Sequence, residues 1–446
     1  MKRIFVPLSL LFFISSCCRD KDAIQDTSKV KPFHEQYYSI EKKKLNEAVD
    51  LFVDYSTCLT KKETEKSSFY PSIHTEIIKC KPTFWSIKGE KIVREEGEIY
   101  TLLNNITDDE SYADIKTTVD AIVKGVNQAI LITDGEYFQN NSNGSNRDNP
   151  YLAESFEKWL VAGHDIYIYS EIYKEKNKFD KRRYYFLFTD HDIENNIFSI
   201  FSRNPLGNVK LTKLSSTDFD VITKYDGVLQ PKVNDVLSIN PESYFAEEDY
   251  EFQEYQIDWS DIVKYIQNAA DPKTGDVKKG GDYVLKGIFV DTKSLDNFTI
   301  QDIGVKVYNA YDAFRSFEDT SFQPRTEKLK EIEELFTIDK EAFKKNGEVV
   351  LKIHKNFTGV GLNNKSDYPQ KENLLKVDIV INDAEDNFDN KSQDFDIFKF
   401  TSVDGMSNNS IYESIESAIK DDCVNPKKVN KGILYTIYIK TASSDL

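Results

Sequence analysis

Cysteine is scarce in this sequence of 446 residues, and the five cysteines lack the spacing typical of metal ligands. A metal site built from cysteines or a disulfide framework is therefore not expected, and a chain of this length can bury a core without disulfides. Outside the N-terminus, no apolar run is long enough to cross a membrane. A glycine-rich phosphate-binding loop, a Gly-x-Ser-x-Gly motif and a His-Glu-x-x-His motif are absent as well. These absences argue against the enzyme classes that such motifs define, and we expect no enzymatic activity.

Basic residues are fewer than acidic ones, at 58 Lys and Arg against 75 Asp and Glu. The net charge is −17, and no stretch of the chain forms a basic stripe. Nucleic acid is therefore not an expected partner, because its phosphates are bound by clustered Lys and Arg. For the same reason, the bulk of the protein should not adhere to an anionic lipid surface. We expect a protein or glycan ligand instead.

The first 16 residues have the pattern of a signal peptide, since Lys2 and Arg3 precede a short apolar stretch, IFVPLSLLFFI. The sequence ISSC, which ends at Cys17, resembles a bacterial lipobox, whose cysteine receives acyl chains such as palmitate after cleavage. We therefore predict an outer-membrane lipoprotein that faces the periplasm or is exposed on the cell surface. Residues 17–45 are predicted to be a polar tether. The alternative is an ordinary secretory signal that happens to end in cysteine.

Residues 46–215 alternate between short strands of the buried type and helices. The runs AVDLFV, AILIT and DIYIY predict central strands, and residues 112–124 have the apolar period of an amphipathic helix. This alternation favours a doubly wound α/β fold, with a mostly parallel sheet and helices on both faces. Residues 216–280 are predicted to be a mixed linker region. Residues 281–446 have the alternating pattern of β-rich, sandwich-like domains, with a helix over Ile411–Ile419.

Polar residues directly follow two of the predicted central strands. Asp54 and Ser56 come after the first strand, in LFVDYSTC, and Asp134 comes after a later one, in ILITDGE. Ligands of an open parallel sheet bind at the carboxyl ends of its strands, so we expect these three side chains at one edge of the sheet. The polar loop Tyr137–Asn149 leaves the same edge and is a further candidate to line a ligand site.

The segments LFVDYSTC and ILITDGE, in this order, resemble a von Willebrand factor type A domain. Members of that family carry Asp-x-Ser-x-Ser after the first strand, a Thr in a mid-domain loop and Thr-Asp-Gly after the fourth strand. These residues hold Mg²⁺ or a similar divalent cation at a metal-ion-dependent adhesion site. The resemblance covers residues 46–215 and implies that Asp54, Ser56, Thr107 and Asp134 are metal ligands. It also implies a binding or adhesion function, in which a carboxylate of the ligand completes the metal coordination.

Cys58 departs from this pattern, because it stands where the second Ser belongs. A thiol is a poor ligand for Mg²⁺, which prefers hard oxygen atoms. Two interpretations therefore remain open: a degenerate metal site, or Asp54, Ser56 and Asp134 as capping and turn residues only. The sequence TDHD at residues 189–192, expected at the same edge, is open in the same way between a ligand site and a helix N-cap. The alternative function for the whole chain is a hydrolase or an accessory subunit of an envelope complex, acting through the β-rich domains.

Overall fold

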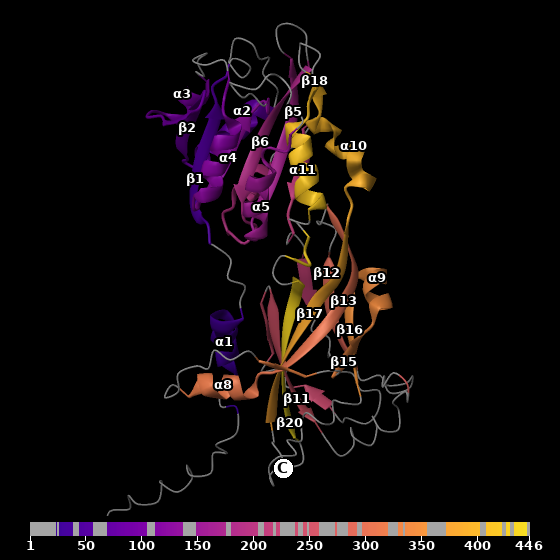
Figure 1. The fold of residues 1–446 in the computed structure, drawn as a ribbon. Helices are drawn as coiled ribbons and strands as arrows, with labels where there is room; N and C mark the ends of the chain where they lie inside the picture. Colours follow the sequence, from indigo (N-terminus) through magenta and orange to yellow (C-terminus); the bar gives the residue numbers. More distant parts are fainter. Residues whose placement is uncertain are drawn as a thin grey trace, which may run out of the picture.

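A seven-stranded sheet, called the first sheet below, is the central element of the N-terminal half of the chain (Figure 1). In the computed structural model, the described residues are 24, 26–38, 44–56, 69–104, 112–136, 149–174, 180–203, 209–216, 220–223, 237–239, 244–247, 249–257, 273, 284–291, 297–319, 329–332, 335–354, 372–401, 407–421, 425–428 and 432–443. Across the first sheet, the strands are β3 (Lys91–Arg94), β2 (Thr83–Lys88), β1 (Asn46–Asp54), β4 (Asn127–Thr133), β6 (Asp180–Thr189), β5 (Asp165–Lys174) and β7 (Lys210–Leu214).

The directions of these strands contradict the predicted doubly wound, mostly parallel fold. Only β1–β2 and β1–β4 are parallel pairs. The other neighbours, β2–β3, β4–β6, β5–β6 and β5–β7, are antiparallel. The reason is that β6 turns back from β5 and inserts between β4 and β5. A buried strand has the same apolar sequence whether its neighbour is parallel or antiparallel, so the composition of β6 did not indicate its direction.

Helices cover both faces of the first sheet, because successive strand residues point to opposite faces and both faces are apolar. In β1, for example, Leu51 and Val53 belong to one buried cluster and Phe52 to the other. The helices of the first face are α2 (Phe69–Lys79), α3 (Ile99–Asn104) and α6 (Ile197–Phe201). The helices of the second face are α4 (Ile115–Lys124), α5 (Ala153–Val161) and α11 (Ser410–Lys420).

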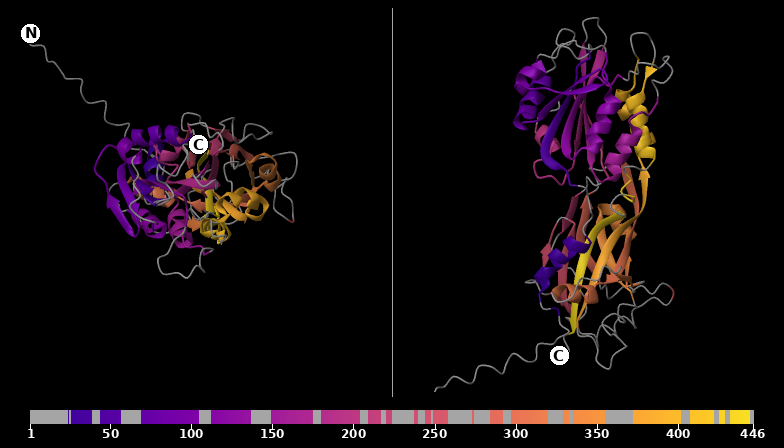
Figure 2. Two further views of the ribbon diagram at one scale, coloured as in Figure 1. Left: turned by 90° about the horizontal axis from the view of Figure 1, so that it is seen from above. Right: turned by 60° about the vertical axis from the view of Figure 1, so that its left-hand side comes forward.

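Two further sheets form the other end of an elongated molecule (Figure 1 and Figure 2). The second sheet has the order β10 (Phe245–Ala246), β11 (Tyr250–Ile257), β20 (Ile433–Ser443), β17 (Glu372–Asp386), β13 (Phe298–Asn309) and β14 (Lys330–Glu331), with β9 (Leu237–Ile239) also paired to β11. The third sheet has the order β15 (Phe336–Ile338), β16 (Glu348–Ile353), β12 (Val284–Asp291) and β8 (Asp220–Thr223), and α9 (Lys340–Asn346) precedes β16. The third sheet is antiparallel, whereas the second contains the parallel pair β11–β20. Apolar residues of both sheets belong to one buried cluster.

The segment predicted to be a tether contains a docked helix. After the short helix η1 (Thr27–Lys29), α1 (Val30–Tyr37) packs against the second sheet and α8 (Tyr311–Glu318). Phe33 is 1 % exposed and meets the ring of Phe314 edge-on, at 5.3 Å between centroids. The His34 ring stacks on Tyr250, at 4.2 Å. The prediction missed this helix because only a few of its side chains are apolar and its partners lie more than 200 residues further along the chain.

The chain leaves the second sheet between the neighbouring strands β17 and β20 and returns to the first sheet. This excursion contains η5 (Asp389–Lys391), α10 (Ser392–Phe395), η6 (Asp396–Phe398), β18 (Phe400–Thr401), β19 (Ser407–Asn408) and α11. The second view in Figure 2 shows α11 beside the helices of the first sheet. The Leu152 backbone N–H, at the start of α5, donates to the Ser414 hydroxyl of α11 (3.1 Å). The Tyr184 hydroxyl of β6 donates to the Ile397 carbonyl of η6 (2.9 Å).

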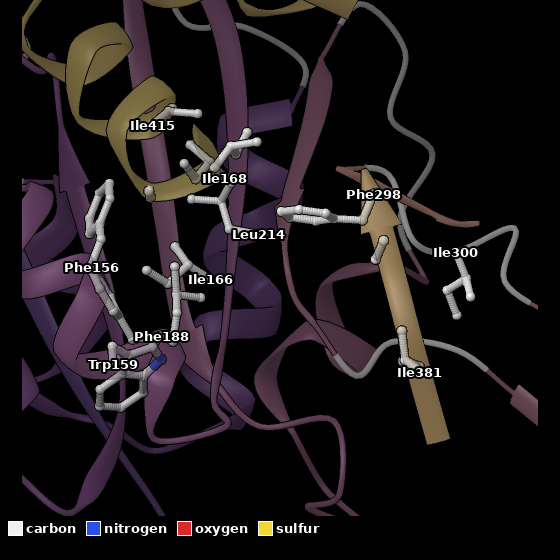
Figure 3. Close-up of a cluster of buried hydrophobic side chains, with 14 of the residues drawn as sticks. Phe156, Trp159, Ile166, Ile168, Phe188, Leu214, Phe298, Ile300, Ile381 and Ile415 are labelled. Atoms are coloured by element: carbon white, nitrogen blue, oxygen red, sulfur yellow. The ribbon is translucent and has the colours of Figure 1, made fainter. Parts of the chain in front are cut away.

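The two ends of the molecule are also joined where β7 meets the start of β13. The Asn297 side-chain amide donates to the Lys213 carbonyl (2.6 Å). The next residues of the two segments, Leu214 and Phe298, are buried and belong to one apolar cluster, which extends to Ile415 of α11 (Figure 3). The polypeptide crosses repeatedly between the two ends, and both ends contribute residues to this cluster. The first sheet therefore has a defined position relative to the second.

Glu251 is a buried carboxyl group in the second sheet, with 1 % of its surface exposed. Burial raises its pKa to about 7, although the Gln253 amide and the Tyr244 hydroxyl donate to it and oppose the rise. In the unfolded chain the pKa returns towards its usual 4.5. Between these values the folded chain binds a proton that the unfolded chain has released, so the stability of the parent falls as pH rises from 4.5 to 7.

We therefore expect Glu251→Gln to stabilise the protein at high pH, because the amide carries no charge to bury. Above pH 7 the gain should approach roughly 3 kcal/mol, the free energy of a shift of this size. Below about pH 4.5 it should vanish, since the parent side chain is then neutral in both states. Urea unfolding of the parent and the variant at pH 4, 6 and 8 measures this difference, and a gain that does not depend on pH would contradict the explanation.

Candidate functional site

Three of the four predicted metal ligands lie together at one edge of the first sheet, called the upper rim below. The upper rim is the edge where β1 and β4 end, and it points away from the second sheet (Figure 1). Since Val53 pairs with Ile132 in the parallel ladder, Asp54 comes opposite Thr133 and next to Asp134. The Thr133 hydroxyl donates to Asp54 Oδ2 (2.9 Å). Asp54, Ser56 and Asp134 are all buried, at 1 %, 5 % and 5 % exposed.

The hydrogen bonds at the upper rim are those of two tight turns. The Ser56 backbone N–H donates to Asp54 Oδ1 (2.7 Å), and the Glu136 backbone N–H donates to Asp134 Oδ1 (3.0 Å). An aspartate that accepts from the backbone two residues later forms an Asx turn. Burial raises the pKa of Asp54, against the lowering effect of the hydrogen bonds from Ser56 and Thr133. These are the contacts that the turn interpretation predicted for Asp54 and Asp134.

The donor atoms at the upper rim nevertheless have the chemistry that a hard cation requires. Carboxylate and hydroxyl oxygens of Asp54, Ser56 and Asp134 suit Mg²⁺, and the Oδ1 atom of each aspartate has a second lone pair beside the one used in its turn. Thr107 and Cys58, which would complete or impair the site, lie outside the described residues, as does all of the polar loop Tyr137–Asn149 except its last residue. The fit of the described residues to Mg²⁺ is therefore partial.

The C-terminal excursion covers this edge of the sheet. Gly135 has φ +75°, a left-handed conformation that favours glycine. A Cβ atom added there would lie 2.5 Å from Cδ1 of Ile411 and 2.8 Å from the Tyr184 ring. The Tyr184 ring also stacks on Phe398 of η6. The turn that carries Asp134 is thus packed against residues more than 260 positions further along the sequence.

A buried ion pair lies near the upper rim on the α2 face of the sheet. Glu171 in β5 and Arg183 in β6 are paired strand neighbours, each 2 % exposed, and the Arg183 guanidinium lies 3.0 Å from Glu171 Oε1. The Tyr185 hydroxyl donates to the same carboxylate oxygen (2.6 Å). This pair holds β5 and β6 together close to the candidate site.

A second polar group lies at the opposite edge, called the lower rim below. The sequence prediction did not place its residues together. The group contains His164, Asp165, Asp190, His191 and Asp192. Residues 189–192 were expected at the same edge as Asp54, and this was wrong. Because β6 is antiparallel to β4, its last residues lie beside the beginning of β4, at the other end of the sheet.

The lower-rim group pairs residues at the start of β5 with residues that follow β6. His191 Nδ1 lies 2.7 Å from Asp165 Oδ2, and its Nε2 lies 2.9 Å from Asp192 Oδ1. His164 Nδ1 lies 3.0 Å from Asp190 Oδ2. Burial lowers the pKa of His191, but its hydrogen bonds with Asp165 and Asp192 outweigh burial and raise the pKa to about 10. His191 thus lies between two carboxylates, one at each of its ring nitrogens.

One signal in the sequence pointed to this group. Two of the five histidines in the chain stand beside aspartates, in HD at residues 164–165 and in DHD at residues 190–192. The first segment lies at the start of β5, and the second follows the end of β6. Only an antiparallel β5–β6 pair brings the start of one strand to the end of the next, so a prediction of parallel strands kept the segments apart.

Comparisons with protein-family models, curated proteins and solved structures found no match for this chain. The resemblance to a von Willebrand factor type A domain therefore rests on the two short segments that suggested it, and the doubly wound fold that it implied is wrong. None of the helices within the described ranges is long and apolar enough to cross a membrane.

Proposed function

We propose that the protein is a lipid-anchored binding or adhesion protein of the cell envelope, which presents the upper rim to a protein or glycan ligand. The lipid attachment at Cys17 and a position at the outer membrane, facing the periplasm or the cell surface, belong to this proposal. The observation that carries it is the place of the first described residues after the predicted anchor, Ile24 and α1, which lie at the end of the molecule opposite the upper rim.

The contacts of Ile24 support this orientation. Its backbone N–H donates to Glu372 Oε2 (2.6 Å), at the start of β17. Ile24 follows Cys17 by only seven positions, so the lipid would lie within about 25 Å of that contact even if the chain were extended. β17 then runs through 15 residues, roughly 45–50 Å, towards the excursion that packs on the first sheet. An anchor at Cys17 would therefore keep the second sheet near the membrane and the upper rim away from it.

The charge of the upper rim limits the chemistry of the ligand. Glu136 is half-buried and places a carboxyl group there, beside the buried carboxyl groups of Asp54 and Asp134. They favour a ligand surface that offers Lys or Arg, or an acidic ligand bridged by a divalent cation. Mg²⁺ bound by Asp54, Ser56, Thr107 and Asp134 would be such a bridge, and it remains a prediction. The comparison of binding with and without Mg²⁺ separates these two modes.

The proposal is tested with the mature chain immobilised through its N-terminus and probed with a glycan array and with collagen and fibronectin. We expect binding to at least one probe, reduced at least about tenfold by Asp134→Asn, which keeps the size of the side chain and removes its charge. The control is Lys330→Ala, an exposed position in β14 at the other end of the molecule, which should bind like the parent. In cells, replacing Cys17 by Ala should abolish labelling with a clickable fatty acid.

Three results would contradict the proposal. The first is retention of the fatty-acid label on the Cys17→Ala variant. The second is binding that is lost in the Lys330→Ala variant and unchanged in the Asp134→Asn variant, which would favour an accessory role of the β-rich end. The third is the absence of binding to any of the probes, with or without 1 mM Mg²⁺.

A further inference from the structure

The lower-rim group contains a buried carboxylate oxygen that no described residue satisfies. Asp165 is fully buried, at 0 % exposed. Its Oδ2 accepts from the His191 backbone N–H (2.9 Å) and contacts the His191 ring, but its Oδ1 accepts no hydrogen bond from the described part of the chain. Buried carboxylate oxygens are otherwise paired with donors, cations or metal ions, because burial removes the water that would solvate them.

Two further ligand atoms lie close to this carboxylate. One ligand atom each of Asp165, Asp190 and His191 can be chosen so that all three lie within 4.8 Å of one another. His191 Nδ1 lies between the carboxylates, at 2.7 Å from Asp165 Oδ2 and 3.9 Å from Asp190 Oδ1. Within the whole group, three carboxylates face two imidazoles, so a bound dication would reduce the excess of negative charge in a buried place.

The surrounding contacts are those that orient metal ligands in proteins. A histidine that binds a metal through one ring nitrogen commonly donates the other N–H to a carboxylate. Here Asp192 Oδ1 lies 2.9 Å from His191 Nε2, which leaves Nδ1 for the ion. The carboxylate of Asp190 is held in turn by His164 Nδ1 (3.0 Å) and by the Asp192 backbone N–H (3.0 Å). Each of the three ligands thus has a neighbour that fixes its orientation.

We infer that Asp165, Asp190 and His191 Nδ1 bind a divalent transition-metal ion, with Zn²⁺ as the preferred ion. Two carboxylates and one imidazole suit Zn²⁺, whereas Mg²⁺ and Ca²⁺ prefer oxygen ligands alone. On binding, the ion takes the place of the Nδ1 proton, which His191 releases to solvent. Asp165 and Asp190 are almost completely buried, and the ion would be structural. It would join the start of β5 to the segment after β6, at the end of the first sheet that faces the second sheet.

The test uses the full mature chain, with Cys17 replaced by Ser so that it remains unlipidated, after treatment with a chelator. We expect elemental analysis to find one zinc per chain after reloading and dialysis, and Zn²⁺ to raise the melting temperature. Asp165→Asn should weaken zinc binding at least about 100-fold, since it removes a charged ligand, and Asp192→Asn should weaken it about tenfold, since it removes only the orienting carboxylate. Asp134→Asn tests whether the zinc binds at the upper rim instead, and the control Asp312→Asn, an exposed position in α8, should bind zinc within about twofold of the parent.

A second measurement on the parent avoids any effect of the variants on folding. Co²⁺ bound by oxygen and imidazole ligands should give visible absorption bands without the near-ultraviolet charge-transfer band of a thiolate. The inference is overturned if the parent retains no zinc, if Asp165→Asn binds zinc like the parent, if Asp134→Asn abolishes binding, or if a thiolate band appears. The test does not depend on the proposed adhesion function, because no adhesion ligand is present.

Discussion

A fragment of residues 44–216, which carries the whole first sheet, is expected not to fold stably by itself. The reason is that α11 covers one face of that sheet from the far end of the sequence. Ile411, Ile415 and Ile419 are each at most 2 % exposed in the complete chain. Burial of each aliphatic side chain contributes about 1.5–3 kcal/mol, so the three together contribute roughly 5–9 kcal/mol. A protein typically has only about 5–15 kcal/mol of net stability.

The fragment should therefore show a non-cooperative urea transition, bind a hydrophobic dye and tend to aggregate on gel filtration. The control is the same fragment joined by a flexible linker to residues 387–421, which restores α11 and the Tyr184–Phe398 contact. We expect cooperative unfolding to return in this linked chain. If the fragment of residues 44–216 alone unfolds cooperatively at the urea midpoint of the full chain, then α11 is dispensable and the expectation is wrong.

Replacing Arg183 by Met is expected to be the most damaging single substitution at the upper rim. It would leave Glu171, 2 % exposed, without the guanidinium that lies 3.0 Å from its carboxylate. Removing one partner of a buried ion pair costs about 3–5 kcal/mol, because the remaining charge stays in the low-dielectric interior. Equilibrium urea unfolding measures the loss, since a two-state transition shifts its midpoint in proportion to the free energy of unfolding.

Two controls separate this effect from a general sensitivity of the first sheet. In the double variant Glu171→Met with Arg183→Met, the buried pair is removed as a whole, so most of the lost stability should return. The variant Lys158→Met also removes one charge of an ion pair, but the partner, Glu154, is exposed on α5. Because water solvates the remaining charge, the urea midpoint should stay nearly unchanged. A double variant as unstable as Arg183→Met would show that packing, rather than the buried charge, is the cause.

Both predictions concern the surroundings of the candidate binding edge. The Asp134 turn packs on Ile411, and the Glu171–Arg183 pair holds the strands beside it. If the upper rim binds a ligand, its shape therefore depends on a C-terminal helix that contributes no residue to the predicted metal site. A variant that loosens α11, such as Ile415→Ala, is for this reason a useful companion to substitutions of Asp54 or Asp134 in binding measurements.

Local patterns in the sequence were enough to place several elements and one set of polar side chains. The apolar runs of β1 and β4 predicted buried strands, and both strands end where Asp54 and Asp134 begin the turns. The apolar period over Ile411–Ile419 predicted the helix α11, which extends over Ser410–Lys420. These predictions succeeded because burial and backbone conformation leave a repeat of 2 or 3.6 residues in the chain itself. For β1 and β4 the prediction of parallel strands was correct. Their parallel pairing brings the two aspartates together.

Only the tertiary structure decided which elements meet. Nothing in the composition of β6 distinguishes a strand that continues a parallel sheet from one that turns back, because both are buried on two faces. The antiparallel direction of β6 moved Asp190 and His191 to the lower rim and brought them to Asp165. In the same way, the apolar period of α11 specified a buried face but not the sheet that buries it. Local sequence determines the conformation of a segment and the side that it buries, whereas its partner is chosen by the free energy of contacts between residues hundreds of positions apart.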